Sequence, residues 1–367
     1  MNAEYIDGAL TFSLSGRIDS NNVEEVEKEI HEEMSFYDKV DVAFDARDLT
    51  YISSAGLRIL LRLKKSLKRP VRVFNVSDDM YDIFSVTGFT EILDVERTMR
   101  QITLHGCKKI SSALNGEIFG LSEDEMIKVY DRSIPLSAIK EERSYAQAAL
   151  IAGIPTLIPY DVVSCEYGYG IVFEMAGAQS LAYVLQREPE KLETYAKMFA
   201  LLVREMHSTE IPEGKLPDIK DRYRGWFSEL GGSNDPLIQT FTRLTESIPD
   251  KPTYVQGDIS LNSVMLKDGE LLLMDMAGSA RGHALFDLQG LFASLVAIER
   301  GHEGYCRKTF GLSGDTCRKF WIAFFREYMK GSEAETDKTN ELLLKYFVLK
   351  EKVLNLVEQK HQLREVS

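Results

Sequence analysis

Residues 263–266 and 271–274 form two short apolar runs on either side of an Asp-Gly pair. Asp-Gly between apolar runs is a strong signal for a β-hairpin. Asp258 precedes the first run and Asp275 ends the second, so a hairpin would bring both carboxylates to one edge of a sheet. Two such carboxylates suit Mg²⁺ and a phosphoryl group, because one can orient a nucleophile while the other holds the metal. We therefore predict Asp258 as the catalytic base and Asp275 as a metal ligand, with an ordinary turn residue as the alternative for Asp275.

The same segment resembles the catalytic core of the aminoglycoside phosphotransferase-like kinases. Their pattern is His-Gly-Asp, four residues, Asn, and then Ile-Asp, and this chain keeps the spacing without a gap. The matching residues are Gln256-Gly257-Asp258, Met274-Asp275 and the later Asp287-Leu288. The resemblance implies a bilobal protein kinase-like fold and transfer of a phosphoryl group from ATP, or GTP, with Mg²⁺. It also implies that Asp287 is a structural carboxylate supporting the catalytic loop.

Two positions depart from this pattern. Gln256 stands where the family has His, and Ser263 stands where it has the metal-binding Asn. Asn262 lies one position earlier, and a shift of one residue on a strand turns a side chain to the opposite face. Ser263 and Asn262 are both candidates for the second metal ligand.

The length and composition predict about two globular domains. The chain has 367 residues, 44% of them hydrophobic, and a formal net charge of −13. Such a charge disfavours nonspecific binding to nucleic acid or to an anionic membrane, which both require a cationic surface. The four cysteines lack metal-ligand spacing, and no apolar run is long enough to span a bilayer. A cytoplasmic protein with reduced thiols is expected.

The first domain, residues 1–104, is predicted to alternate strands and helices. Strands are expected at 9–14, 39–44 and 71–76, and amphipathic helices follow each of them. This alternation is typical of an α/β sandwich. The overall fold class is therefore α/β followed by α+β.

Two motifs in this domain, at residues 48–57 and 84–89, resemble the STAS domain of bacterial anti-sigma factor antagonists. The resemblance implies an anti-sigma factor or another STAS-binding protein as a partner. It also implies a phosphorylated serine directly before Gly-Leu at a helix start, but that position is Ala55. Ser54 and Ser53 are the nearest hydroxyls. Each is a candidate phosphosite, and the alternative is that one of them simply caps the helix.

Residues 105–175 are expected to form the N-lobe of the kinase-like domain. A linker is predicted at 105–114, followed by paired strands at 116–121 and 125–130. Lys128 lies in the second of these apolar strands, where an unpaired cation is costly. The resemblance implies that Lys128 holds the α- and β-phosphates and pairs with Glu142 on the next helix. The alternative is a surface lysine and a solvated glutamate.

The lobes are predicted to join near residue 175, where backbone groups of Glu174, Met175 and Ala176 would contact adenine by the same resemblance. The C-lobe would cover residues 176–367. Tyr223, Trp226 and Phe227 would either line its acceptor cleft or lie in its core.

Our preferred hypothesis is a phosphotransferase acting on a small-molecule or protein hydroxyl, with the STAS domain regulating it or docking a partner. One alternative is a regulatory protein whose kinase-like domain is weakly active or inactive. Another is an enzyme that phosphorylates its own STAS domain at Ser53 or Ser54.

Overall fold

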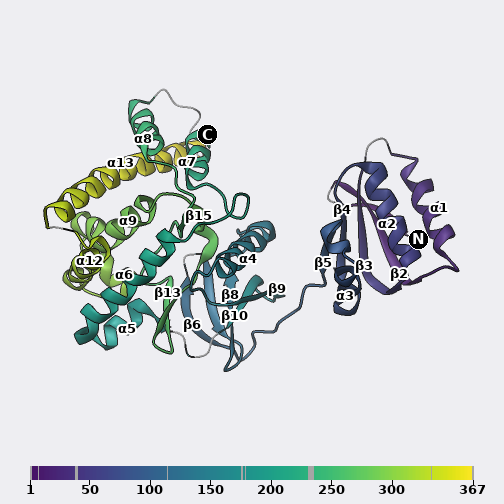
Figure 1. Cartoon of the computed structure of the whole chain (residues 1–367), viewed down its shortest axis with the longest axis horizontal. Helices are drawn as coiled ribbons and strands as arrows, with labels where there is room; N and C mark the ends of the chain where they lie inside the picture. The colour runs from purple at the N-terminus through teal and green to yellow at the C-terminus, as the bar shows by residue number, and fades with distance from the viewer. Residues whose placement is uncertain are drawn as a thin grey trace. The chain divides into compact units, whose positions relative to one another are not determined.

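The computed structural model describes residues 2–6, 8–37, 40–113, 115–174, 177, 179–229, 235–331 and 333–365. The chain divides into two compact units, Met1–Arg100 and Gln101–Ser367. Both mix strands and helices (Figure 1). In the part of the chain so described, no helix has the length and apolar character needed to cross a membrane.

The first unit is a five-stranded sheet with helices packed on it. The strands lie in the order β1-β2-β3-β4-β5; β1 is antiparallel to β2, and the other neighbours are parallel. Phe12 and Phe44 stack in its core with ring centroids 5.6 Å apart. The elements are β1 (Asn2–Ile6), β2 (Ala9–Ile18), α1 (Val23–Met34), β3 (Asp41–Ile52), α2 (Ser54–Leu67), β4 (Val71–Val76), α3 (Asp78–Val86) and β5 (Asp94–Arg97).

Helix α2 begins with a serine cap. The Ser53 hydroxyl accepts a hydrogen bond from the Gly56 backbone N–H at 3.3 Å, so Ser53 has the capping role that the sequence left open. Ser54 is exposed in the first turn. Gly56 packs closely, since a Cβ there would lie 2.8 Å from Ile52 Cγ1 and 2.9 Å from Ile18 Cγ2.

The second unit begins with a five-stranded antiparallel sheet in the order β6-β7-β8-β10-β9, packed against α4 (Leu136–Ile151). The strands are β6 (Lys108–Ala113), β7 (Gly116–Gly120), β8 (Glu125–Tyr130), β9 (Pro159–Cys165) and β10 (Gly168–Glu174). The predicted linker at 105–114 is therefore wrong, because most of it is the edge strand β6. Lys108, Lys109 and Ile110 are exposed, and an edge strand with exposed side chains shows no hydrophobic alternation.

The predicted hairpin is confirmed as β13 (Val264–Lys267) and β14 (Glu270–Leu273). Asp268 and Gly269 form its two-residue turn with φ of 49° and 85°, the positive values that this turn requires. The short strand β11 (Gln179–Ser180) extends the sheet, while β12 (Tyr254–Val255) pairs with β15 (Ala280–Arg281).

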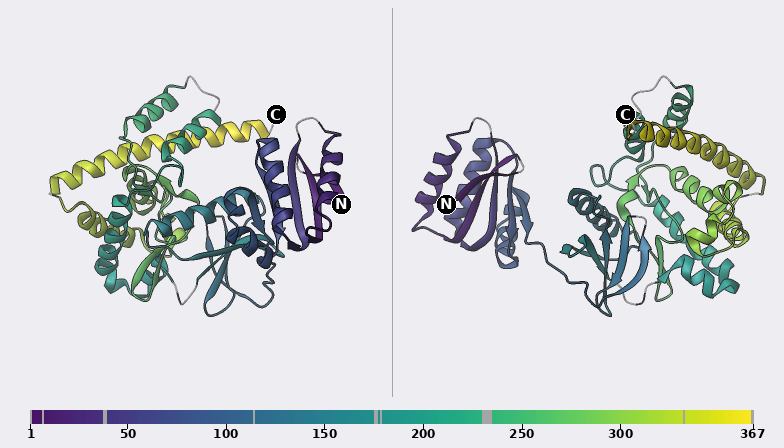
Figure 2. Two further views of the ribbon diagram at one scale, coloured as in Figure 1. Left: turned by 45° about the vertical axis from the view of Figure 1, so that its right-hand side comes forward. Right: turned by 180° about the vertical axis from the view of Figure 1, so that it is seen from behind.

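Helices make up the rest of the second unit. The helix α13 packs on α8 and α9 and is far longer than its neighbours (Figure 2). The helices are α5 (Leu181–Arg187), α6 (Leu192–Ser208), α7 (Ile219–Glu229), α8 (Pro236–Ser247), α9 (Leu285–Phe292), α10 (Ile298–Gly301), α11 (Tyr305–Phe310), α12 (Gly314–Met329) and α13 (Glu333–Glu365).

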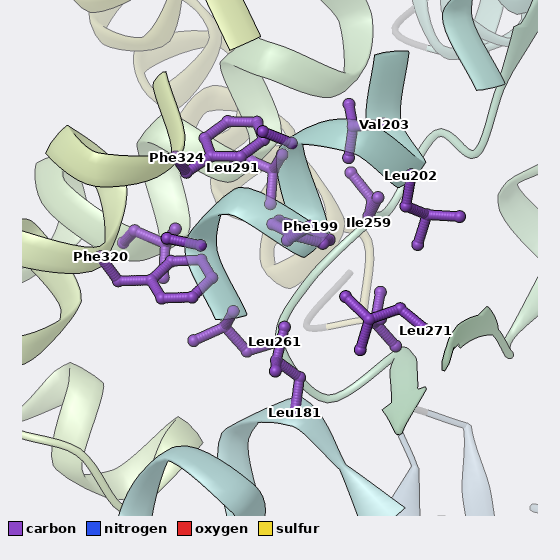
Figure 3. Close-up of a cluster of buried hydrophobic side chains, with 14 of the residues drawn as sticks. Leu181, Phe199, Leu202, Val203, Ile259, Leu261, Leu271, Leu291, Phe320 and Phe324 are labelled. Carbon is purple, nitrogen blue, oxygen red and sulfur yellow. The ribbon is translucent and has the colours of Figure 1, made fainter. Parts of the chain in front are cut away.

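A hydrophobic core anchors the loop that carries Asp258. Phe199 of α6 packs against Phe320 and Phe324 of α12 at centroid distances of 5.8 and 5.1 Å. Ile259 and Leu261 reach into the same core (Figure 3). Because these apolar neighbours of Asp258 are buried, they anchor the loop in the core, while Asp258 itself is exposed.

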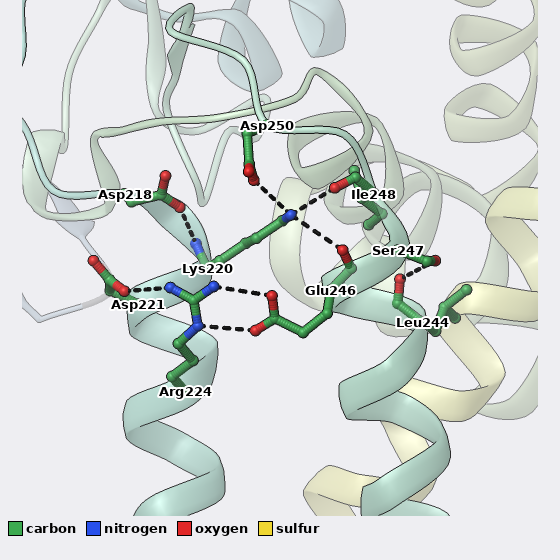
Figure 4. A network of polar contacts seen from close by, with 9 residues as sticks. All are labelled: Asp218, Lys220, Asp221, Arg224, Leu244, Glu246, Ser247, Ile248 and Asp250. Carbon is green, nitrogen blue, oxygen red and sulfur yellow. Dashed lines mark hydrogen bonds and ion pairs between the residues drawn. The ribbon is translucent and has the colours of Figure 1, made fainter.

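A polar network joins α7 to the end of α8 (Figure 4). The buried Lys220 ammonium donates to the Ile248 carbonyl at 2.6 Å and contacts Asp250 at 2.6 Å. Arg224 makes two hydrogen bonds to Glu246, at 2.8 and 2.9 Å. Bidentate pairs of this kind fix geometry well, so α7 is held firmly in place.

Tyr223 of α7 belongs to the core, where its ring packs against Phe241 and Phe286 at 6.0 and 5.3 Å. The side chains of Trp226 and Phe227 lie outside the described part of the structure.

Candidate active site

Lys128 lies between two carboxylates. Its Nζ is 3.0 Å from Glu142 Oε1 on α4 and 2.6 Å from Asp275 Oδ1 at the end of β14. Lys128 and Glu142 are only 2% and 3% exposed. Burial lowers the pKa of Lys128, but the negative charges of Asp275 and Glu142 outweigh it and the pKa is raised. A permanent positive charge is therefore held where β8, α4 and the hairpin meet.

Asp275 adopts a left-handed backbone conformation, with φ 62° and ψ 71°. A non-glycine residue rarely adopts this conformation, and such residues cluster at functional sites. The backbone of the preceding residue is fixed, since the Met274 N–H donates to the Ser263 carbonyl at 2.8 Å. The hairpin thus sets the direction in which Asp275 points.

Gln256 joins the loop of Asp258 to the loop of Asp275. Its Oε1 accepts the Asp258 N–H at 3.1 Å, and its Nε2 donates to the Asp275 carbonyl at 2.6 Å. The two loops also touch through their backbones: a Cβ on Gly257, whose φ is 84°, would lie 2.3 Å from the Gly278 carbonyl oxygen. The glutamine found in place of the family's histidine therefore has a definite structural task.

Asp287 holds the same loop from the other side. It is fully buried and accepts the backbone N–H groups of Gln256 and Gly257 at 2.8 and 2.7 Å. Its Oδ2 also lies 3.0 Å from His207 Nε2, and His207 Nδ1 contacts the Tyr328 hydroxyl at 2.8 Å. These bonds tie Asp287 to the backbone of the loop that carries Asp258, and its role as the structural support of a catalytic loop stays a prediction.

The Asp258 side chain reaches solvent, but the protein around it removes enough hydration to raise its pKa. The positive charges of Lys350 and Arg222 oppose this rise, while Asp287 and Asp275 add to it. Arg222 on α7 is itself anchored, because it donates to the Ala277 and Ser279 carbonyls at 2.8 and 3.0 Å.

Lys350 reaches the site from α13. Its Nζ lies 3.4 Å from Gln289 Oε1 and 5.6 Å from the centre of the Tyr223 ring. Burial lowers its pKa, and the charge of Asp258 opposes that change. Neither Lys350 nor Arg222 was predicted as a site residue, because each is one charge among many on its helix.

The two candidates for a second metal ligand are engaged elsewhere. The Ser263 hydroxyl donates to the Ser260 carbonyl at 3.1 Å and accepts the Ser260 N–H at 2.8 Å. The Asn262 amide donates to the Thr309 carbonyl of α11 at 2.9 Å. Across the described residues, no cluster of three or more His, Cys, Asp or Glu side chains forms a metal site. The role of Asp275 as a metal ligand stays a prediction.

At the predicted hinge, Glu174 ends β10. Its Oε1 accepts the Ile158 N–H at 3.1 Å and its Oε2 pairs with Lys267 of the hairpin. Met175 and Ala176 lie outside the described residues.

We expect Gln256→Ala to lower the free energy of unfolding by about 1–3 kcal/mol, because buried polar groups of both loops lose their partners. Urea denaturation measures the effect. Gln239→Ala, at an exposed position on α8, is the matched control and should leave the stability unchanged. Wild-type stability in Gln256→Ala would contradict the bridging role.

Comparison with known proteins separates the two units. The STAS domain family matches residues 1–102. The candidate anti-sigma factor antagonist BtrV of Bordetella bronchiseptica is 32% identical over 95 residues, which are 25% of this chain and 81% of that protein. This chain belongs to the STAS domain family. Its STAS domain contains the capped helix start with Ser53 and the exposed Ser54.

Solved structures similar to this chain include a choline/ethanolamine kinase family protein and aminoglycoside phosphotransferases. A choline/ethanolamine kinase family protein from Mesorhizobium loti is 13% identical, with a TM-score of 0.46, covering 70% of this chain and 80% of its own. Aminoglycoside phosphotransferase APH(2″)-Ib, solved with ADP bound, is 17% identical, with a TM-score of 0.45, covering 67% and 85%. At these identities the similarity concerns the fold alone.

Proposed function

We propose that this protein is an ATP- and Mg²⁺-dependent phosphotransferase acting on a hydroxyl acceptor, with residues 105–175 and 176–367 as its two lobes. The observation that carries the proposal is the buried Lys128, which is paired with Glu142 and Asp275. A buried cation is costly unless it is paired or used on an anion. Lys128 is paired with Asp275, and Gln256 joins the loop of Asp275 to the loop of Asp258.

The residues present fit a magnesium ion that is held mainly by phosphates. Mg²⁺ usually keeps several waters and binds proteins through one or two carboxylates together with substrate phosphates. The buried Asp275 Oδ1 has no hydrogen-bond partner in the described structure beyond its ion pair with Lys128, so it has capacity to bind a cation. Ser263 and Asn262 stay predictions for further ligands, and each would first have to release Ser260 or Thr309.

Each site residue then has a distinct task. Lys128 binds the α- and β-phosphates, and Glu142 keeps its ammonium in place. Asp258 accepts a hydrogen bond from the acceptor hydroxyl, orients it, and takes its proton. When bound, Mg²⁺ supplies charge neutralisation on the phosphates. Catalysis of this kind rests on positioning and electrostatic stabilisation.

The nucleotide base would lie against the backbone of Glu174, Met175 and Ala176, with GTP as the alternative to ATP. The acceptor is a small-molecule or protein hydroxyl. The STAS domain would dock a protein partner, such as an anti-sigma factor, or regulate transfer.

The full chain tests this proposal directly. Titration calorimetry should show ATP binding that strengthens with Mg²⁺, and labelled ATP should be turned over slowly even without an acceptor. A panel of amines, amino alcohols, aminoglycosides and STAS-binding proteins then probes for the acceptor. Absence of both nucleotide binding and turnover would overturn the proposal.

The placement of Ser263 and Asn262 favours a second candidate function, a regulatory protein whose kinase-like unit binds nucleotide without turnover. Both side chains are committed to Ser260 and Thr309 rather than to Asp275. For this candidate, a thermal shift with ATP should be equal with and without Mg²⁺. Measurable ATP hydrolysis would exclude it.

A further inference from the structure

A pocket opens on the second unit at the ends of α6 and α12, two helices that pack against each other (Figure 1). Side chains from residues 201–208 and 328–330 line it, and its volume is about 700 Å³. Pockets for small molecules have volumes of about 300–1,000 Å³. Neither Lys128, Asp258 nor Asp275 lines this pocket, so it is separate from the candidate active site.

Two cations line the pocket, and neither is paired within the chain. Arg204 is half-buried, and Lys330 is exposed at the end of α12. Among the described residues, neither side chain makes a hydrogen bond or an ion pair with a carboxylate. Glu205 also lines the pocket, so one negative charge stands against two positive ones. The pocket is therefore positive in a chain whose formal net charge is −13, and it favours an oxyanion.

The same pocket offers a hydroxyl and an apolar wall. Burial, followed by the charge of Asp287, raises the pKa of Tyr328 to about 12, and the charge of Arg204 opposes the rise. The phenol therefore stays protonated at neutral pH. Leu201 is 54% exposed on the other helix, which is unusual for a leucine and leaves apolar surface for the rest of a ligand.

Hydrogen bonds connect the pocket to the loop of Asp258. The Tyr328 hydroxyl lies 2.8 Å from His207 Nδ1, and His207 Nε2 lies 3.0 Å from Asp287 Oδ2. Asp287 in turn accepts the N–H groups of Gln256 and Gly257. Tyr328 and His207 line the pocket themselves, so a ligand there contacts the side chains that hold Asp287.

We propose that this pocket is a second binding site, which takes a small molecule that carries a phosphate or carboxylate group. Arg204 and Lys330 bind the oxyanion, and the apolar part of the ligand lies against Leu201. The bound ligand keeps Tyr328 in place and, through His207 and Asp287, restricts the motion of the loop of Asp258. This site requires neither a nucleotide nor phosphoryl transfer.

Binding is tested with phenyl phosphate and benzoate, and benzamidine is the cationic compound with the same ring. In the full chain with ¹³C-methyl methionine, either anion should shift the NMR signal of Met329, which lines the pocket and is assigned with Met329→Leu. Benzamidine should not shift it. The anion with the lower Kd shows which oxyanion the site prefers. No shift with either anion would overturn the inference.

Arg204→Gln/Lys330→Gln should raise the Kd of the bound anion at least tenfold, because hydrogen bonds to charged groups are lost. Arg307→Gln/Lys308→Gln, on the exposed face of α11, is the matched control with the same change of charge and should leave the Kd unchanged. Both double variants replace cations without ion pairs, so both should melt at the wild-type temperature. Equal affinities in the two double variants would contradict binding by Arg204 and Lys330.

Hydrogen exchange tests the connection to the loop. With phenyl phosphate at ten times its Kd, exchange at residues 256–258 should slow by up to about tenfold, because an opening that disrupts the pocket must first lose its ligand. Exchange in β9 should not change. Tyr328→Phe removes the contact with His207 and should abolish the slowing. Slowing that persists in Tyr328→Phe or in Arg204→Gln/Lys330→Gln, or no slowing in the wild type, would refute the connection.

Discussion

Asp258→Asn is expected to lower phosphoryl transfer by about a thousandfold while ATP still binds. A positioned general base contributes about 10²–10⁴-fold to a rate, and the asparagine amide cannot take the proton of the acceptor hydroxyl. In the proposed function, ATP is bound mainly through Lys128 and Asp275, which the substitution leaves in place. Single-turnover assays measure the rate, and calorimetry with Mg·ATP measures the affinity.

The same substitution is not expected to destabilise the fold. The pKa of Asp258 is raised, chiefly by loss of hydration, so its ionised form is disfavoured in the folded protein. An acid whose pKa is higher in the folded than in the unfolded protein stabilises the fold only at low pH. That stabilisation is lost as the pH rises through the pKa of the folded protein. At neutral pH, Asp258→Asn should therefore melt at the wild-type temperature or slightly above it.

The activity has the corresponding pH dependence. Asp258 must be ionised to accept a proton, so wild-type transfer should fall as the pH is lowered through its raised pKa. Asp268→Asn, in the exposed hairpin turn, is the control and should keep the wild-type rate and pH profile. A wild-type rate in Asp258→Asn would remove Asp258 from the chemistry.

Local sequence patterns predicted the hairpin well because its turn is specified by two adjacent residues. The turn needs positive φ at both Asp268 and Gly269, residue types that adopt it readily, and the apolar runs beside them can be buried in only one arrangement. The edge strand β6 escaped prediction for the opposite reason. Its exposed Lys108 and Lys109 carry no hydrophobic period, and only its pairing with β7 makes it a strand.

Long-range contacts limited prediction of the site. The family resemblance suggested Lys128 and Glu142, and the predicted hairpin suggested Asp275, but neither showed that one ammonium contacts both carboxylates. Arg222 and Lys350 come from helices whose packing no local pattern specifies. Their charges oppose the rise in the pKa of Asp258, so the electrostatics of the site depend on residues distant from it in sequence.

Gln256 shows why a departure from a family pattern need not break a site. In the sequence it stands only as a departure from the pattern of the kinases that this chain resembles. In the structure its amide both donates and accepts, and so it bridges two loops with one side chain. Ser263 differs, because its hydroxyl is hydrogen-bonded to the backbone of Ser260 within the same turn. It would have to release that backbone before it could serve beside Asp275 as a second ligand for a metal.

Lys128→Met is expected to destabilise the second unit by about 3 kcal/mol, because removing one partner of a buried ion pair leaves an uncompensated charge. Glu142, at 3% exposure, would be left without its cation. Both tryptophans of the chain, Trp226 and Trp321, belong to the second unit, so tryptophan fluorescence during urea unfolding reports on that unit alone.

The double variant Lys128→Met/Glu142→Leu separates stability from function. Replacing both members of a buried pair with apolar side chains is often neutral or stabilising, so most of the lost free energy of unfolding should return. ATP affinity should stay low in both variants, because the phosphate-binding ammonium is absent from each. If Lys128→Met alone is as stable as the wild type, the ion pair with Lys128 does not stabilise the buried Glu142. If the double variant binds ATP with wild-type affinity, Lys128 does not bind phosphate.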